Sequence, residues 1–302
     1  AGLYVPYLRL GVQRRRMIMG KPFSTARSRS SLRRIKRYLR KFPRPFFLSI
    51  WHHVKTRPVL GDQLPQAREL RQPPATVLGS IAQRDSALRF VKWEKYFDFY
   101  GRILDQQAET SRSEGGSGAP IRLLEIGVAE GGSLNLWREY FGDKAVIYGI
   151  DVDPRCASLP NVKAEVRIGS QTDPGFLSSV VEEMGGVDIV IDDGSHLSQD
   201  VVQSFLHLFP KLESPGYYFV EDLHTSYWPK WGGGLRRRQS SIEFLRTLVD
   251  VQNSFYFNAN ATKQSLPSAV SNATIQQITF SDSICAVSKA SVAEPRPFQS
   301  SR

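Results

Sequence analysis

The sequence has few cysteines, no long apolar run and, over its first 80 residues, almost no acidic side chains. Cys156 and Cys285 are the only cysteines among 302 residues, which leaves no disulfide framework and no cysteine spacing typical of zinc sites. No apolar run approaches the roughly 18 residues that a membrane-spanning helix needs. These absences favour a globular protein of a reducing compartment, and we expect a cytoplasmic location.

The net charge of +11 is unevenly distributed along the chain. Residues 1–80 hold 18 Lys and Arg but only two Asp and Glu, whereas the rest of the chain has more acidic than basic side chains. We therefore expect a basic, largely unstructured extension that serves as an interaction tail. Within it, residues 31–42 have the apolar spacing of a short basic amphipathic helix, so residues 31–51 are a candidate for peripheral membrane contact. A transit segment and a solvated leader remain alternatives.

Composition divides the remaining chain into four parts. Residues 81–106 are aromatic-rich with a helical period, and we expect a lead-in helix that packs on the following domain through Leu88, Val91, Tyr96 and Tyr100. The Ser/Gly-rich residues 107–119 predict a flexible linker. A catalytic domain is expected over 120–290, and a tail over 291–302.

From residue 120 onward, predicted strands and helices alternate, which favours an α/β fold with a doubly wound, mostly parallel sheet. Two further strands over 275–289 would complete a seven-stranded, Rossmann-like sheet. The other strands are expected near 121–126, 145–150, 163–168, 187–191 and 217–221, and the helices near 133–141, 174–184, 198–209 and 240–252.

A glycine-rich turn follows the first of these strands in LLEIGVAEGGSL, and a second strand ends at Asp151. This layout is typical of nucleoside binding, with the acid on the ribose hydroxyls. The dinucleotide version needs glycine at the second position of the motif, where Ala129 stands. S-adenosylmethionine (SAM) fits better, because its amino-acid end carries no phosphate.

Adjacent acids end two strands that would be neighbours in the sheet, in VIDDGSH and VEDLH. Because ligands of such sheets bind at the carboxyl edge, Asp192, Asp193, Glu221 and Asp222 are expected to converge there. Four crowded carboxylates require compensation, and oxygen ligands favour Mg²⁺, Mn²⁺ or Ca²⁺. Asp192 facing the cofactor, and acids that merely cap helices, remain alternatives.

A metal site of this kind suits methyl transfer to an oxygen. A sugar hydroxyl is scarcely ionised at neutral pH, and a divalent cation lowers its pKa. Histidine side chains titrate near neutral pH, and His196 follows Asp193 by three residues, so it is placed to accept the proton.

In this order, LLEIGVAEGGSLNLW, YGIDVDP, GSQTDPGFL, VIDDGSH, VEDLHTSYWPKWGGG and ITFSDSICAVSK resemble the metal-dependent sugar O-methyltransferases of macrolide biosynthesis, of the mycinamicin and macrocin type, and their rhamnosyl O-methyltransferase relatives. The resemblance covers residues 86–289. It implies a class I SAM-dependent enzyme with Mg²⁺, a sugar or glycoside acceptor, and a homo-oligomer.

The resemblance also implies roles for particular residues. It makes Asp193, Glu221 and Asp222 the magnesium ligands and His196 the general base. It assigns to the SAM site Glu125, Gly127, Gly131, Ser133, Asp151, Ser170, Gln171 and Asp192, with Ser170 and Gln171 on the adenine side. Residues 225–238 are expected to form an acceptor loop in which Tyr227, Trp228 and Trp231 stack on a sugar ring, and a packed aromatic loop followed by a solvated Arg236–Arg238 run is the alternative.

Other functions stay open on the sequence alone. The same fold could act on a lipid glycan or an RNA, or serve without catalysis as a SAM-fold protein tethered by its basic helix. A nucleic-acid partner is disfavoured, because the excess positive charge lies outside the catalytic domain and no RNA-reading motif is found.

Overall fold

The computed structural model describes residues 76–84, 89–112, 120–257, 267, 270 and 274–297. The expectations for residues 1–75, including the amphipathic helix and the membrane contact of 31–51, lie outside these described residues. No helix within the described ranges is both long and apolar enough to cross a membrane.

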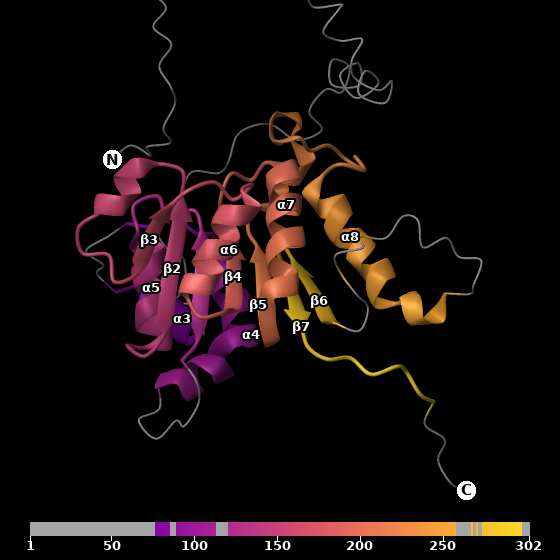
Figure 1. Cartoon of the computed structure of the whole chain (residues 1–302), viewed down its shortest axis with the longest axis horizontal. Coiled ribbons are helices and arrows are strands. Elements are labelled where there is room, and N and C mark those ends of the chain that lie inside the picture. Colours follow the sequence, from indigo (N-terminus) through magenta and orange to yellow (C-terminus); the bar gives the residue numbers. More distant parts are fainter. Residues whose placement is uncertain are drawn as a thin grey trace, which may run out of the picture. The chain divides into compact units, whose positions relative to one another are not determined.

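A seven-stranded sheet with the order β3-β2-β1-β4-β5-β7-β6 forms the centre of the fold (Figure 1). The first five strands of that order run parallel to one another, β7 pairs antiparallel with β5, and β6 pairs antiparallel with β7, so that β7 alone of the seven runs in the opposite direction. This confirms the predicted doubly wound, Rossmann-like methyltransferase sheet. The strands are β1 (Arg122–Ile126), β2 (Val146–Asp151), β3 (Glu165–Ile168), β4 (Val187–Asp192), β5 (Leu212–Val220), β6 (Ile275–Ser281) and β7 (Ile284–Lys289).

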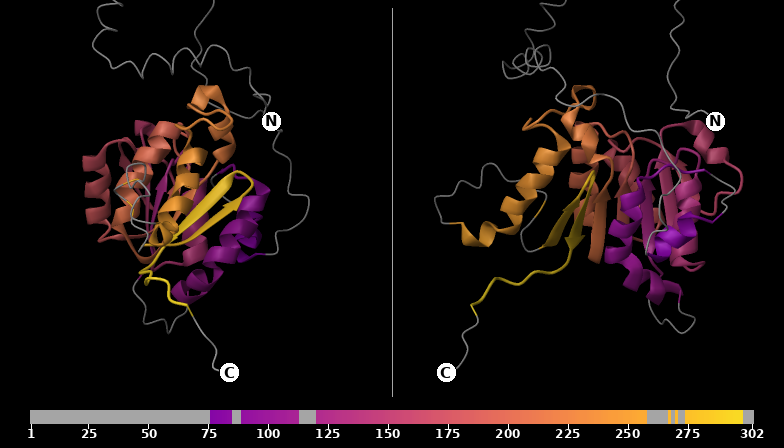
Figure 2. Two further views of the ribbon diagram at one scale, coloured as in Figure 1. Left: turned by 90° about the vertical axis from the view of Figure 1, so that its right-hand side faces the viewer. Right: turned by 180° about the vertical axis from the view of Figure 1, so that it is seen from behind.

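Helices cover both faces of the sheet (Figure 2). One layer contains α3 (Val77–Ala82), α4 (Glu94–Arg112) and α5 (Gly132–Phe141), whose apolar side chains form one buried cluster with the strands. The other contains α6 (Pro174–Glu183), α7 (Ser198–Leu208) and α8 (Ser241–Gln252), which form the second cluster. Short 3-10 turns span Pro154–Ser158, Phe209–Lys211, Leu223–Tyr227, Pro229–Trp231 and Ser254–Tyr256.

Local sequence explains how these helices begin and which face they bury. The Asp173 carboxylate accepts hydrogen bonds from the backbone N–H groups of Gly175 and Phe176, and Pro174 occupies the first turn of α6. In α7, Val201, Phe205 and Leu208 recur at helical spacing and are all buried.

The lead-in helix differs most from its prediction. Residues 89–93 have no regular secondary structure, and α4 runs over Glu94–Arg112 rather than within 81–106. Tyr96 and Tyr100 are buried as expected, but Val91 precedes the helix and is 70% exposed. Helix α4 continues into the predicted linker because its last turn is anchored to α5, where the Arg112 guanidinium donates a hydrogen bond to the backbone carbonyl of Tyr140. Residues 113–119 of that linker lie outside the described residues.

Candidate active site

The alternation of side chains along the strands determines which acids meet. In β4, Ile189 and Ile191 pack on the α4 side of the sheet, whereas Val190 packs on the α7 side. Asp192 continues this alternation toward α7, since successive side chains of a strand point to opposite faces. In β5, Phe219 packs on the α4 side, so Glu221 faces that side as well.

Asp192 consequently does not join the other strand-end acids. Its Oδ2 accepts hydrogen bonds from the hydroxyls of Ser204, at 2.5 Å, and Tyr218, at 3.0 Å. Its Oδ1 accepts one from the Gln171 amide, whose own oxygen accepts the backbone N–H of Ser195. Asp192 and Gln171 thus hold the loop that contains His196 through hydrogen bonds on the α7 side of the sheet. The cofactor contacts predicted for these two residues stay predictions.

The structure brings a residue into the acid cluster that the sequence patterns did not single out. Lys92, in the segment before α4, places its ammonium nitrogen 2.7 Å from Glu221 Oε1, 3.0 Å from Asp193 Oδ2 and 3.3 Å from Glu125 Oε1. Its side chain is 1% exposed. No local motif marks Lys92, because its partners lie on three strands that are distant in sequence.

Aromatic residues beside Lys92 bind the two acids that follow β5. Tyr100 donates its hydroxyl to Glu221 Oε1 at 2.6 Å. Tyr96 and the Trp93 indole both donate to Asp222 Oδ1, at 3.0 and 3.1 Å. The lead-in segment therefore supplies hydrogen-bond donors to the site in addition to packing against the sheet.

Three side chains offer ligand atoms that all lie within 4.8 Å of one another: Asp193, His196 and Asp222. His196 Nε2 lies 3.7 Å from Asp222 Oδ2 and 4.0 Å from Asp193 Oδ1. Both His196 and Asp222 have positive φ angles, of 56° and 53°. Non-glycine residues in this region carry a conformational cost and are common at functional sites.

Glu221 stands beside this trio, with Oε1 committed to Lys92 and Tyr100. Within the described residues, none of the hydrogen bonds found involves its other oxygen, Oε2. Glu221 is thus linked to Asp193, one member of the trio, because both carboxylates form an ion pair with the Lys92 ammonium.

Burial and neighbouring charge shift the pKa values of the inner groups. Burial alone would lower the pKa of Lys92, but Asp193, Glu221 and Glu125 outweigh it and raise that pKa well above its usual value. Burial, reinforced by the charge of Asp193, raises the pKa of Glu221 to about 8. Burial likewise raises the pKa of Glu125. The ammonium is thus held in its charged form by the surrounding carboxylates.

The glycine-rich turn lies against the same cluster. Gly127 has a φ of 96°, and a Cβ there would stand 2.2 Å from the backbone oxygen of Asp193. Gly131, with a φ of 78°, begins α5, and Ser133 donates to Glu125 Oε2 at 2.8 Å. The predicted SAM residues of this turn therefore adjoin the predicted metal residues directly.

Asp151, at the end of β2, holds the turn from the other side. Its Oδ2 accepts the backbone N–H groups of Val128 and Ala129, at 2.9 and 3.2 Å. Ser170 makes a hydrogen bond with Thr172 after β3. The contacts predicted for Asp151 and Ser170 with a nucleoside stay predictions.

The predicted acceptor loop is partly packed and partly exposed. Trp228 is 7% exposed, with its ring centroid 4.9 Å from that of His224 and 5.2 Å from that of Trp231. Tyr227 is 38% exposed. His224, which no sequence pattern singled out, is hydrogen-bonded to Ser283 and lies 4.0 Å from Asp222 Oδ1.

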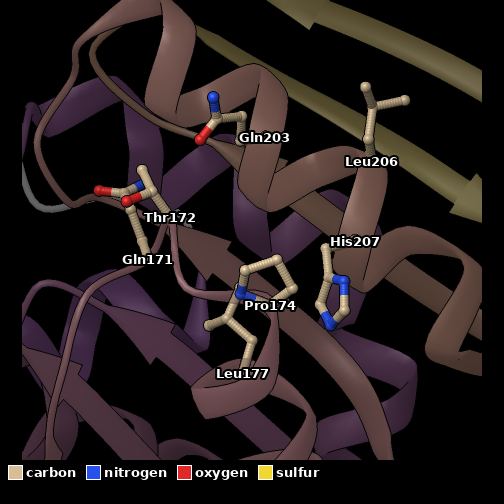
Figure 3. A pocket seen from close by; sticks show the side chains of 7 residues that line it. All are labelled: Gln171, Thr172, Pro174, Leu177, Gln203, Leu206 and His207. Atoms are coloured by element: carbon tan, nitrogen blue, oxygen red, sulfur yellow. The ribbon is translucent and has the colours of Figure 1, made fainter.

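A separate cavity of about 280 Å³ opens between α6 and α7 (Figure 3). No acidic side chain is among the residues that line it. Its lining consists of Gln171, Thr172, Pro174, Leu177, Gln203, Leu206 and His207.

No family model matches the chain, whereas curated proteins do. It is 41% identical over 183 residues to the 8-demethyl-8-(2-methoxy-alpha-L-rhamnosyl)-tetracenomycin-C 3'-O-methyltransferase of Streptomyces olivaceus, covering 57% of this chain and 44% of the relative. It is 36% identical over 178 residues to the 8-demethyl-8-alpha-L-rhamnosyl tetracenomycin-C 2'-O-methyltransferase of the same organism, covering 56% and 46%. The match thus spans less than half the length of either relative.

Among solved structures, the MycE methyltransferase from the mycinamycin biosynthetic pathway, in complex with Mg and SAH, matches with a TM-score of 0.58. The sequence identity is 27%, and the match covers 69% of this chain and 54% of that one. The resemblance to sugar O-methyltransferases that the motifs indicated is therefore confirmed.

Proposed function

We propose that this chain is a SAM- and Mg²⁺-dependent O-methyltransferase that methylates a hydroxyl of a sugar or of a glycosylated natural product. The observation that carries the proposal is the meeting of Asp193, Asp222 and His196 at one sheet edge, directly beside the glycine turn at Gly127. The relatives named above carry out reactions of this class, as their names state.

The donor set fits a hard divalent cation. The carboxylate oxygens of Asp193 and Asp222 are the ligand type that Mg²⁺ prefers, and the Glu221 carboxylate shares the Lys92 ammonium with Asp193. The group contains no cysteine, which disfavours softer metals. Asp193, Glu221 and Asp222 would hold the cation.

The cofactor pocket fits a ligand that needs a close backbone approach. A side chain at Gly127 would collide with the backbone of Asp193, so this position of the turn requires glycine. Gly131, Ser133 and Asp151 shape the same turn. These residues would hold SAM, with Ser170, Gln171 and Asp192 as the further predicted contacts.

The chain's own residues would divide the chemistry among them. When bound, the divalent cation lowers the pKa of a hydroxyl placed on it, and SAM supplies an electrophilic methyl group. His196, with Nε2 facing both aspartates, would take the hydroxyl proton. The leaving thioether is neutral, so the reaction needs no general acid.

Removal of the metal tests the proposal directly. We expect methyl transfer from SAM to a rhamnosyl natural product to stop with EDTA and to return with added Mg²⁺. Transfer that continues unchanged in EDTA would remove the metal from the mechanism.

Substitution of His196 distinguishes a general base from a metal ligand at this position. We expect His196→Ala to lose turnover by about 100-fold or more while Mg²⁺ and SAM still bind. His207→Ala, a histidine on α7 away from the cluster, serves as the matched control. If His196→Ala loses Mg²⁺ binding instead, the imidazole is a metal ligand rather than the base.

The acceptor class follows from the same proposal. Exposed Tyr227 and the neighbouring Trp231 offer aromatic faces on which a sugar ring can stack. Parallel assays with a glycosylated polyketide and with a lipid-linked glycan carrying the same sugar would separate the two acceptor classes. Methylation of neither, with an active Mg²⁺ site, would argue against a sugar acceptor.

A further inference from the structure

Lys92 occupies an unusual place for a lysine, enclosed among carboxylates from three neighbouring strands. Its ammonium forms ion pairs with three carboxylates: Glu125 at the end of β1, Asp193 after β4 and Glu221 after β5. Within the part of the chain that the structure describes, no other Lys or Arg forms an ion pair with these three acids. A solvated surface lysine would not be 1% exposed.

The neighbours of Lys92 hold it in this place. Trp93 and Tyr96 are hydrogen-bonded to Asp222, and Tyr100 is hydrogen-bonded to Glu221, so the chain on the C-terminal side of Lys92 is tied to the same cluster. A buried charge is tolerated only when it is paired and hydrogen-bonded, and breaking such a pair leaves an uncompensated charge. The contacts of Lys92 satisfy that condition.

The two oxygens of Asp193 face different partners. Oδ2 is 3.0 Å from Lys92, whereas Oδ1 faces His196 and belongs to the side where the cation would lie. Lys92 therefore contacts a predicted metal ligand on the side opposite to His196. A positive charge at such short range opposes the binding of a second positive charge by Coulomb repulsion.

We propose that Lys92 is a resident cation of the metal site: its charge compensates the carboxylates of Asp193 and Glu221 before the metal arrives, and the same charge lowers the affinity for the divalent ion. It offsets part of the negative charge of Glu125, Asp193, Glu221 and Asp222, so that the site takes one divalent cation at moderate affinity. Lys92 acts through the carboxylates and is a positioning residue. This inference rests on the metal site of the proposed function.

The test is divalent-ion binding to the full-length chain, measured by calorimetry with MgCl₂ and with MnCl₂. For Lys92→Met, which keeps an unbranched side chain, one atom shorter, and removes the charge, we expect binding at least about tenfold tighter than in the wild type. Lys92→Arg keeps the charge and should stay within about threefold of the wild type.

Lys95→Met is the matched control. Lys95 lies three residues away, is 37% exposed and pairs with Asp282 outside the cluster. The Lys95→Met substitution makes the same change in net charge as Lys92→Met. We expect it to change the affinity for the divalent ion by less than about twofold, since exposed charges are screened by salt.

Thermal unfolding gives a readout independent of affinity. In EDTA, Lys92→Met should unfold well below the wild type, and saturating Mg²⁺ should recover most of the difference, because the added cation replaces the missing charge. A Lys92→Met chain that stays unfolded at saturating Mg²⁺ counts against the proposal.

The outcomes are distinguishable. Wild-type chain with no saturable Mg²⁺ or Mn²⁺ binding overturns the proposed metal site, and this inference with it. Wild-type binding together with unchanged or weaker binding by folded Lys92→Met overturns the role of Lys92 alone. Equal tightening in Lys92→Met and Lys95→Met would show an effect of net charge rather than of this position.

Discussion

At the scale of single residues, two adjacent aspartates serve opposite sides of the sheet. Asp192 is hydrogen-bonded to Ser204 and Tyr218 on the α7 side, and Asp193 contacts Lys92 on the α4 side. The place of Asp192 among the strand-end acids is taken by Glu125, from the end of β1. Adjacent acids in a sequence thus indicate a site at a strand end, while strand alternation decides which acid belongs to it.

The hydroxyl of Tyr100 should contribute measurably to stability. Tyr100→Phe removes the donor to Glu221 Oε1 and leaves a buried carboxylate with fewer partners, so we expect a loss of about 1–3 kcal/mol. Urea unfolding in EDTA measures it. Tyr148→Phe, whose hydroxyl makes a 3.3 Å contact with Glu183, is the control and should cost about 0.5 kcal/mol or less. Equal costs would contradict the special role of the Glu221 contact.

Both thiols should be unreactive in the folded protein. Burial raises the pKa of Cys156 to about 11 and raises that of Cys285 further, and both side chains are buried. Because the thiolate is the reactive form, a thiol reagent at pH 8 should label neither cysteine until the chain is unfolded, when both should react. Rapid labelling of native protein would contradict this placement.

At the scale of elements, the glycine turn after β1 and the loop after β4 are built against each other. Gly127 allows the Asp193 carbonyl to approach the turn, and Asp151 accepts two backbone N–H groups of the same turn. A change in the turn is therefore transmitted directly to the residues proposed to hold the metal.

Gly127→Ala tests this coupling. The new Cβ would stand 2.2 Å from the Asp193 backbone oxygen, so we expect a loss of about 2–4 kcal/mol in unfolding free energy together with weakened Mg²⁺ and SAM binding. Gly185→Ala is matched to it: Gly185 has a φ of 73°, but nothing lies within 4 Å of the added Cβ. That control should cost roughly 1 kcal/mol and leave both affinities unchanged. Similar losses in both variants would mean that backbone strain, rather than the collision, dominates.

The lead-in segment shows what helical periodicity can and cannot reveal. Its aromatic pattern predicted a helix packed on the sheet through Tyr96 and Tyr100, and both are buried. The pattern did not reveal that their hydroxyls reach Asp222 and Glu221, because a contact between residues more than 100 positions apart leaves no local signal.

At the scale of the whole molecule, three layers place all the site residues at one edge of the sheet. The carboxyl ends of β1, β4 and β5 are neighbours in the strand order, so their terminal acids meet, while helices on both faces exclude water from the strands. Binding of the proposed metal at this edge would be coupled to the stability of the entire sheet.

Metal binding should therefore raise the melting temperature. A cation that binds only the folded chain, at about 100 times its Kd, adds about 2.7 kcal/mol of stability. For a fold of this size that corresponds to roughly 5–10 °C. Thermal scans with Mg²⁺ and with EDTA measure the shift, and the double variant Asp193→Asn, Asp222→Asn should lose it. A shift that persists in the double variant would place the cation elsewhere.

Local sequence patterns were sufficient to predict the succession of the seven strands and of helices α4 to α8 along the chain, a mostly parallel sheet, the glycine turn and the strand-end acids, but not α3. These features are encoded locally, in apolar periodicity, in glycine and proline positions and in adjacent acids. The assembled fold was needed to show that Asp192 points toward α7, that Glu125 points into the acid cluster, and that Lys92 lies within that cluster. Those outcomes depend on side-chain direction and on contacts across the sheet, which arise only when β1, β4, β5 and the segment before α4 are assembled.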